Sequence, residues 1–193
     1  FMVGSNADEG ALFLSQLPFQ RAAGYRAAVR AFFGARAGDF LRLFPCESDG
    51  RVKTAFTRFT TVTAFIAPAR LLAKAMGGKR SPAYLYHFTR VAPVLKARGL
   101  GATHAAEIPY VFGTLRAPAY AERDFELART MQACWIRFAR TGDPNGEGLP
   151  KWPAYAATAD EHLEIGDEVR VGRGLYKEAC DLLEQALADR RRP

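Results

Sequence analysis

Two side chains in this sequence have the chemistry of an acid–base pair. His104 lies in a loop that opens with Gly101, after a strand-like run, and histidine is scarce, with 3 in 193 residues. An imidazole titrates near neutral pH, so it can take up a proton and return it. Glu9 lies in a loop after another strand end, and its carboxylate could fix the tautomer of an imidazole. These residues predict a general base, His104, that is oriented by an acid, Glu9.

Glu9 and His104 also have ordinary structural interpretations, and their order along the chain helps to decide between these and a catalytic role. A lone histidine more often makes a structural hydrogen bond, and the helix dipole favours an acidic residue near a helix start. The acid precedes the histidine, however, as in α/β-hydrolases, where a nucleophilic serine comes before both. Asp8 is interpreted as a helix N-cap. His87, on a strand face, and His162, in a polar loop, are interpreted as structural.

Hydrophobic periodicity predicts a helix-rich α/β chain with a few strands. Residues 51–76 carry a long helical pattern, and Pro68 predicts a kink or break near Ala67 because proline removes a hydrogen bond and its ring clashes. Residues 83–88 form the best strand, and residues 163–171 resemble a hairpin. Further helices are predicted at residues 8–18, 19–36, 39–44, 120–140 and 175–189, and a strand end at residues 1–3.

The composition suits one globular domain or a large piece of one. Hydrophobic residues make up 49% of the chain, and no apolar run approaches the length of a membrane span. The first residues show no signal-peptide pattern. Residues 1–4 read as the end of a buried strand, so we expect the chain to be a fragment of a longer polypeptide.

The net charge of +7 could indicate an anionic partner such as nucleic acid. The arginines, however, are spread along the whole chain. Only Arg190, Arg191 and Arg192 form a run, and they follow a helix whose C-terminal end favours cations. This distribution favours a solvated surface over nucleic-acid binding.

The thiols and carboxylates show no metal or cofactor motif. Cys46, Cys134 and Cys180 are odd in number and far apart, so neither a disulfide framework nor a CxxC site is predicted and the compartment stays open. His104 and Glu107 form an H-x-x-E pair of metal-ligand types, but no third ligand is spaced to join them. We therefore expect Glu107 to be a buried hydrogen-bonding residue beside the histidine loop, with no metal or cofactor.

Five short segments of the chain form a specific set. They are GSNADEG at residues 4–10, YLYHF at 84–88, GATHAAEIPYVFG at 101–113, WIRFARTGDPN at 135–145 and LPKWPAY at 149–155. Together and in this order they resemble the type-B carboxylesterase family, which includes the cholinesterases. The resemblance reaches from residue 1 to about residue 155.

The resemblance implies an α/β-hydrolase fold and a reaction. Residues 1–193 would be the C-terminal part of a single α/β-hydrolase domain, rich in helices and carrying the last few strands of the central sheet. Glu9 would be the triad acid, His104 the triad base, and Asp8 structural. The implied reaction is hydrolysis of a small-molecule carboxylic ester by Ser–His–Glu acyl transfer, and the resemblance argues against a metal at Glu107.

The nucleophile of such a triad is not found in this sequence. It should lie in a G-x-S-x-G elbow between a strand and a helix, and no serine has glycines at both of those positions; the serines are Ser5, Ser15, Ser48 and Ser81. The glycine-rich oxyanion loop is missing too, and in the family both lie upstream of residues 4–10. The isolated chain is therefore predicted to be inactive and to need the upstream part of the protein as its partner.

Two other classes of function stay open. One is a non-catalytic hydrolase-fold protein used for binding or adhesion, although the presence of both Glu9 and His104 argues against it. The other is a basic interaction domain for an anionic partner. Within the resemblance, Cys180 falls at one half of a C-terminal disulfide of cholinesterase-like members, and Ala67 replaces the partner cysteine, so the bridge is predicted to be absent. Aromatic residues at helical spacing could line a pocket, although this spacing favours plain core; they are Phe32, Phe33, Phe56, Phe59 and Phe65.

Overall fold

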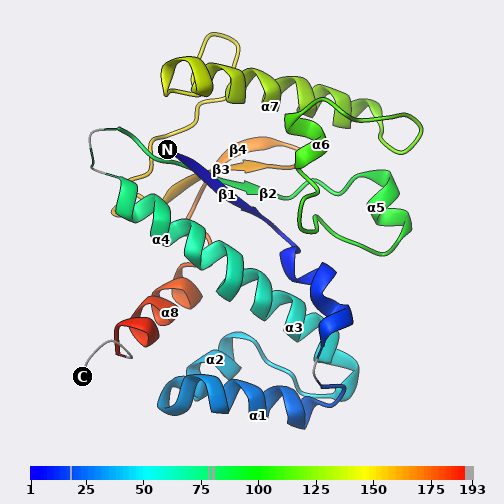
Figure 1. Cartoon of the computed structure of the whole chain (residues 1–193), viewed down its shortest axis with the longest axis vertical. Helices are drawn as coiled ribbons and strands as arrows, with labels where there is room; N and C mark the ends of the chain where they lie inside the picture. Colours follow the sequence, from blue (N-terminus) through cyan, green and yellow to red (C-terminus); the bar gives the residue numbers. More distant parts are fainter. Residues whose placement is uncertain (18, 78, 80, 190–193) are drawn as a thin grey trace.

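The computed structural model describes residues 1–17, 19–77, 79 and 81–189 (Figure 1). The run of Arg190, Arg191 and Arg192 lies outside the described residues, and so does Pro18 at the expected end of the first helix. A four-stranded sheet in the order β1-β2-β3-β4 lies at the centre. Its first three strands are parallel and its last pair is antiparallel: β1 (Met2–Asn6), β2 (Tyr84–Phe88), β3 (Glu161–Ile165) and β4 (Val169–Arg173). The predicted α/β class is confirmed.

Helices cover both faces of this sheet, as the side chains of β2 require. Tyr84 and Phe88 of β2 point to one face, where they join the core beneath the long helix α7 (Glu122–Thr141). Leu85, between them, joins a core on the opposite face with α4 (Ala67–Met76). Figure 1 shows α7 above the sheet and α4 crossing below it, with α8 (Lys177–Asp189) beyond α4. A strand buried on both faces is what the near-continuous apolar run of β2 predicts.

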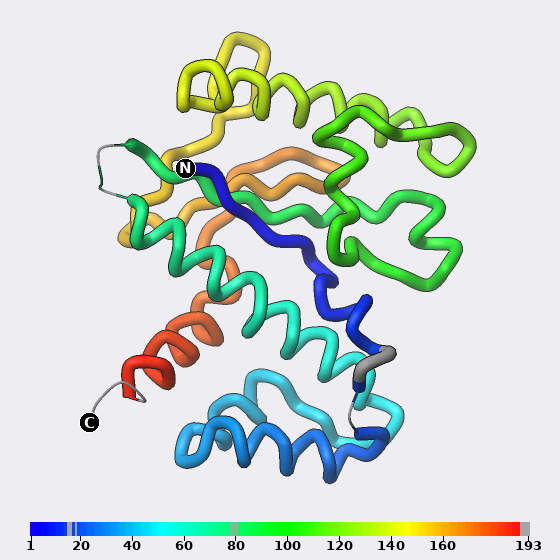
Figure 2. The backbone as a smooth tube through the Cα atoms, viewed as in Figure 1, coloured from blue at the N-terminus to red at the C-terminus, as the bar shows by residue number. Residues whose placement is uncertain are grey.

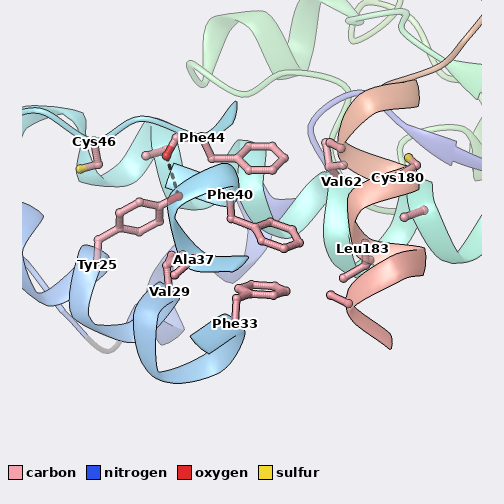
Figure 3. Close-up of a cluster of buried hydrophobic side chains, with 14 of the residues drawn as sticks. Tyr25, Val29, Phe33, Ala37, Phe40, Phe44, Cys46, Val62, Cys180 and Leu183 are labelled. Carbon is pink, nitrogen blue, oxygen red and sulfur yellow. Dashed lines mark hydrogen bonds between the residues drawn. The ribbon is translucent and has the colours of Figure 1, made fainter. Parts of the chain in front are cut away.

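A third hydrophobic core joins a separate helical layer to α8 (Figure 3). Its members include Phe33 and Phe40, whose rings stack with centroids 3.6 Å apart, and Leu183 of α8. The buried Tyr25 hydroxyl donates a hydrogen bond of 2.9 Å to the carbonyl of Phe44. The layer consists of α1 (Ala22–Phe33), η2 (Gly34–Arg36), α2 (Ala37–Leu43), η3 (Asp49–Arg51) and α3 (Val52–Thr60).

The aromatic residues singled out in the sequence divide between core and pocket. Phe33 is buried in the helical core. Together with Phe32, Phe56 and Phe59 it also lines an apolar pocket of about 730 Å³ between α1, α3, α4 and α8. Phe65 lies elsewhere, beside His104. These side chains therefore contribute both to the core and to the wall of the pocket. Helical spacing alone does not distinguish these two roles.

Residues 52–76 form one continuous rod with an irregular turn before its proline (Figure 2). The segment η4 (Thr61–Ile66) is π-helical and joins α3 to α4. Pro68 is the second residue of α4, directly after η4, so its missing N–H and its ring fall where the helix changes from the wider π turn to the α form. The expected disturbance near Ala67 is therefore present, but the wider turn of η4 absorbs it, without a break in the helix.

One assignment from the sequence is wrong, because His162 lies in β3 and not in a polar loop. Its side chain is buried, with 4% of the residue exposed. It pairs across the hairpin with Gly172, and a Cβ atom at Gly172 would come within 2.6 Å of the imidazole. The missing side chain on β4 makes room for the ring, so the strand begins at Glu161, two residues earlier than the apolar pattern indicates.

The connections after β1 and β2 carry the loops of Glu9 and His104. A 3-10 helix, η1 (Glu9–Gln16), follows β1 where a regular helix was expected, and α5 (Pro93–Ala97) and α6 (Ile108–Val111) follow β2. No described helix is both long and apolar enough to cross a membrane. Cys46, Cys134 and Cys180 are buried free thiols.

Candidate active site

The structure brings Glu9 and His104 into direct contact, although 95 residues separate them. The distance from His104 Nδ1 to Glu9 Oε2 is 2.7 Å. Glu9 opens η1, just beyond the carboxyl end of β1, and His104 lies in the loop after β2. The parallel pairing of β1 and β2 puts both carboxyl ends at the same edge of the sheet, which is where open α/β sheets carry their sites.

Glu9 is a buried carboxylate with a defined set of partners. Only 5% of the residue is exposed. Its Oε1 accepts a 2.8 Å hydrogen bond from the backbone N–H of Asn6, while Oε2 faces the imidazole. Burial raises the pKa of Glu9, whereas the hydrogen bonds from Asn6 and His104 act in the opposite direction. Because the surroundings are poorly solvated, this carboxylate would interact strongly with a positive charge on His104.

His104 turns one ring nitrogen to the acid and leaves the other free. Half of its side chain is exposed. The imidazole contacts two phenylalanine rings, Phe13 of η1 and Phe65 of η4, with centroid distances of 6.1 and 5.3 Å, and these two rings also contact each other at 5.8 Å. Nδ1 is taken by Glu9, and within the described part of the chain no hydrogen bond reaches Nε2. If Nδ1 carries the proton, Nε2 is an available base.

A strained turn holds the histidine loop in place. Ala105, the residue after His104, has a φ of 67°, a left-handed conformation that costs a residue with a Cβ atom about 1–2 kcal/mol. Within this turn the N–H of Ala106 donates to the carbonyl of Thr103 at 3.0 Å. Backbone strain persists only where the surroundings compensate for it, and it is concentrated at functional sites.

Asp8 ties the two loops together instead of making a cap hydrogen bond. It occupies the N-cap position of η1, as predicted, but its carboxylate makes no cap hydrogen bond there. Its Oδ2 accepts a 2.9 Å hydrogen bond from the N–H of Ala102, and its own N–H donates to the carbonyl of Ala102, also at 2.9 Å. A Cβ atom at Gly101 would fall 1.9 Å from this carboxylate. Glycine at 101 is therefore required for the loop of Glu9 to approach the loop of His104.

Comparison with known proteins identifies the family of this chain. A sequence model described as the carboxylesterase family matches residues 44–183. The chain belongs to the carboxylesterase family. The family implies the α/β-hydrolase fold, and the sheet and helices described above are consistent with the C-terminal part of it.

Individual relatives of this carboxylesterase-family chain are ester hydrolases by name. Fumonisin B1 esterase of Sphingopyxis macrogoltabida is 35% identical over 188 residues, which are 90% of this chain and 33% of that protein. Human cocaine esterase is 32% identical over 159 residues, 78% of this chain and 28% of the relative. Mouse carboxylesterase 3B is 36% identical over 135 residues, 64% and 24% respectively. The chain thus spans about a third or less of the length of these relatives.

In this carboxylesterase-family chain the buried ion pair between Arg90 and Asp124 packs against the segment that follows His104. Asp124, in the first turn of α7, is fully buried. Its Oδ1 accepts hydrogen bonds of 2.7 Å from Arg90 Nε and 2.6 Å from the hydroxyl of Tyr110, a residue of α6. Burial raises the pKa of Asp124, but Arg90, Tyr110 and the N–H of Ala121 outweigh burial and lower it overall. The ionised carboxylate therefore joins the end of β2, the segment after His104 and α7.

Glu107 lies beside the pair, where the sequence predicts a hydrogen-bonding role. It is half-buried, and its Oε2 accepts a hydrogen bond from the side-chain amide of Asn6. Among the described residues no group of three His, Cys, Asp or Glu side chains could hold a metal ion. The sequence did not single out Asn6 or Phe13 as site residues, and Phe65 was listed only as a pocket candidate, because neither the amide network nor the ring contacts leave a local pattern.

Proposed function

We propose that this chain supplies the acid and the base of a carboxylic ester hydrolase that acts by Ser–His–Glu acyl transfer. The observation that carries the proposal is the 2.7 Å contact between His104 Nδ1 and the buried Glu9 carboxylate. The other ring nitrogen, Nε2, has no hydrogen bond to the described residues, and half of the side chain is exposed. The named activities of the family relatives support the reaction class. Residues 1–193 would be the C-terminal part of a single α/β-hydrolase domain.

The proposed reaction uses His104 twice. A serine hydroxyl supplied from outside residues 1–193 attacks the ester carbonyl, and His104 Nε2 takes its proton. Glu9 holds the Nδ1 proton and stabilises the imidazolium that forms. The C–O bond to the alkoxide then breaks, the alkoxide takes the proton from His104 and leaves as an alcohol, and the acyl group stays on the serine. Water attacks this acyl group with the same assistance, which releases the carboxylic acid and restores the serine.

The pre-steady-state release of p-nitrophenol tests this function. We expect the complete protein to hydrolyse p-nitrophenyl butyrate with an initial burst of about one equivalent per chain, because an acyl-enzyme accumulates when deacylation is slower. Residues 1–193 alone should give no burst, since they lack the nucleophile and the oxyanion donors. Paraoxon should abolish the burst and add one phosphoryl group to a serine.

Two results would overturn the proposal. The first is a folded complete protein that neither releases p-nitrophenol nor reacts with paraoxon, which would favour the non-catalytic binding class. The second is a burst from residues 1–193 alone, which would place a nucleophile within this chain.

A further inference from the structure

Asn6 lies between the segment that carries the acid and the segment that carries the base. It is the last residue of β1, and only 1% of it is exposed. Its backbone N–H donates to Glu9 Oε1 at 2.8 Å. Its side-chain Nδ2 donates to the carbonyl of Thr103 at 2.7 Å and to Oε2 of Glu107. One buried residue thus binds the acid, the residue before the base and the residue three positions after it.

The chemistry of its partners fixes the orientation of this amide. Thr103 offers a carbonyl oxygen and Glu107 a carboxylate oxygen, and both accept hydrogen bonds. A flipped amide would point its own oxygen at two acceptors. In the observed orientation Oδ1 is buried and has no partner among the described residues. In this orientation both side-chain N–H groups bind the histidine loop, whereas Oδ1 makes no hydrogen bond to the described residues.

Two carboxylates approach each other at this point, and Asn6 donates to both. Burial raises the pKa of Glu9, and the negative charge of Glu107 raises it further. The hydroxyl of Tyr86 has a raised pKa, from burial first and then from the charges of Glu107 and Glu9. The titratable groups around Asn6 are thus Glu9, Glu107, His104 and Tyr86. The backbone N–H of Asn6 donates to Glu9 and its side-chain amide donates to Glu107, and these two hydrogen bonds lessen the repulsion between the carboxylates.

We propose that Asn6 is a positioning residue for the acid–base pair: with Glu107 it clamps the His104 loop to the end of β1 and so holds the imidazole opposite Glu9. This inference rests on the proposed function. Asn6 touches neither substrate nor the reacting atoms, so it acts through Glu9 and His104. Its side-chain amide binds Thr103 and Glu107, which are 97 and 101 positions away along the chain and lie on either side of His104. A shift of this side chain would therefore displace His104 relative to Glu9.

The substitution Asn6→Asp in the complete protein tests the clamp. It preserves the shape of the side chain, removes the two N–H donors and adds a third negative charge. We expect kcat/KM per titrated active site to fall roughly 10- to 100-fold, mainly through kcat, with KM changed less than about threefold. The acid limb of the kcat/KM profile should move up by about one pH unit, because added negative charge favours the protonated forms.

A second change should restore what the first removes. In the double variant Asn6→Asp, Glu107→Gln the new amide at position 107 can donate to the new carboxylate at position 6, and the total charge returns to its original value. We expect most of the pH shift and at least about tenfold of kcat/KM to be recovered. Titration with a fluorophosphonate counts the active sites, so any loss of folded protein does not enter the comparison.

A matched control is offered by Asn145, which also donates its side-chain amide to a carboxylate. Its Nδ2 contacts Asp143 Oδ1 at 2.7 Å and the carbonyl of Trp152 at 2.9 Å, in the turn after α7. Asn145→Asp should reduce stability and leave the pH profile unchanged.

The outcomes separate the two proposals. If wild-type turnover does not depend on His104, the proposed function itself fails. If turnover depends on His104 but Asn6→Asp keeps the parental profile per active site, or Glu107→Gln brings no rescue, the clamp is refuted and Asn6 is a structural residue only.

Discussion

Replacing His104 with alanine in the complete protein is expected to lower kcat/KM for p-nitrophenyl butyrate by roughly four orders of magnitude or more. No other described side chain contacts Glu9 as an imidazole does, and Nε2 of His104 is the atom that would take the serine proton. Without it the hydroxyl must ionise unaided. Initial rates at substrate concentrations well below KM measure this quantity directly.

The exposed Phe112 provides the control for this substitution. It lies eight positions further along the same segment, just after α6, and 73% of it is exposed. Phe112→Ala should leave kcat/KM within about twofold of the parent, as surface changes usually do. If a folded His104→Ala protein retained turnover near that of the parent, His104 could not be the base.

Replacing Asp124 with asparagine should lower the free energy of unfolding by about 3–5 kcal/mol, because it leaves the charge of Arg90 buried without its main partner. The carboxylate is fully buried and accepts hydrogen bonds from Arg90, from Tyr110 and from the N–H of Ala121 at 2.8 Å. The side chain of Arg90 is 14% exposed, and among the described residues its one further ion-pair partner is the exposed Asp167. Urea denaturation followed by circular dichroism gives the change.

The effect of Asp124 should depend on pH in a defined direction. Its pKa is lowered in the folded protein, so its contribution is complete above the pKa of the unfolded chain, near 4, and disappears as the pH falls through the folded value. The difference between parent and Asp124→Asn should therefore shrink below about pH 4. The control is Glu122→Gln in the same turn of α7, where the ion pair with Arg129 is exposed and 3.6 Å long; it should cost less than about 1 kcal/mol. A loss that small for Asp124→Asn would contradict the role assigned to the buried pair.

Local patterns in the sequence predict most of the elements. The aromatic alternation of residues 84–88 and the apolar pairs around Gly166 correspond to β2 and to the β3–β4 hairpin. The stripe along residues 120–140 corresponds to α7. These features depend on neighbours within a few residues, and such neighbours can be read directly from a sequence. The same reading misplaced His162, because the space for its ring comes from Gly172 on the next strand.

The site was predicted less completely, because contacts between distant segments build it. Residue types and order singled out Glu9 and His104, and the structure places them side by side. The residues that surround Glu9 and His104 show no pattern in the sequence that predicts their contacts. Asn6 reaches Glu107 across 101 residues, and Phe65 arrives from a π-helical turn that no periodicity indicated. Asp8 appeared to be a helix cap, but its carboxylate binds Ala102 in the other loop.

The central claim is that Glu9 and His104 act as one unit, and a double-mutant cycle on kcat/KM tests it most directly. Glu9→Gln places an amide opposite Nδ1; this amide can donate to Nδ1 and so favour the tautomer that cannot accept a proton at Nε2. The account predicts a loss of about 10⁴-fold for this single change and almost no further loss when it is added to His104→Ala. Turnover of Glu9→Gln within about tenfold of the parent, or a further large loss in the double variant, would contradict it.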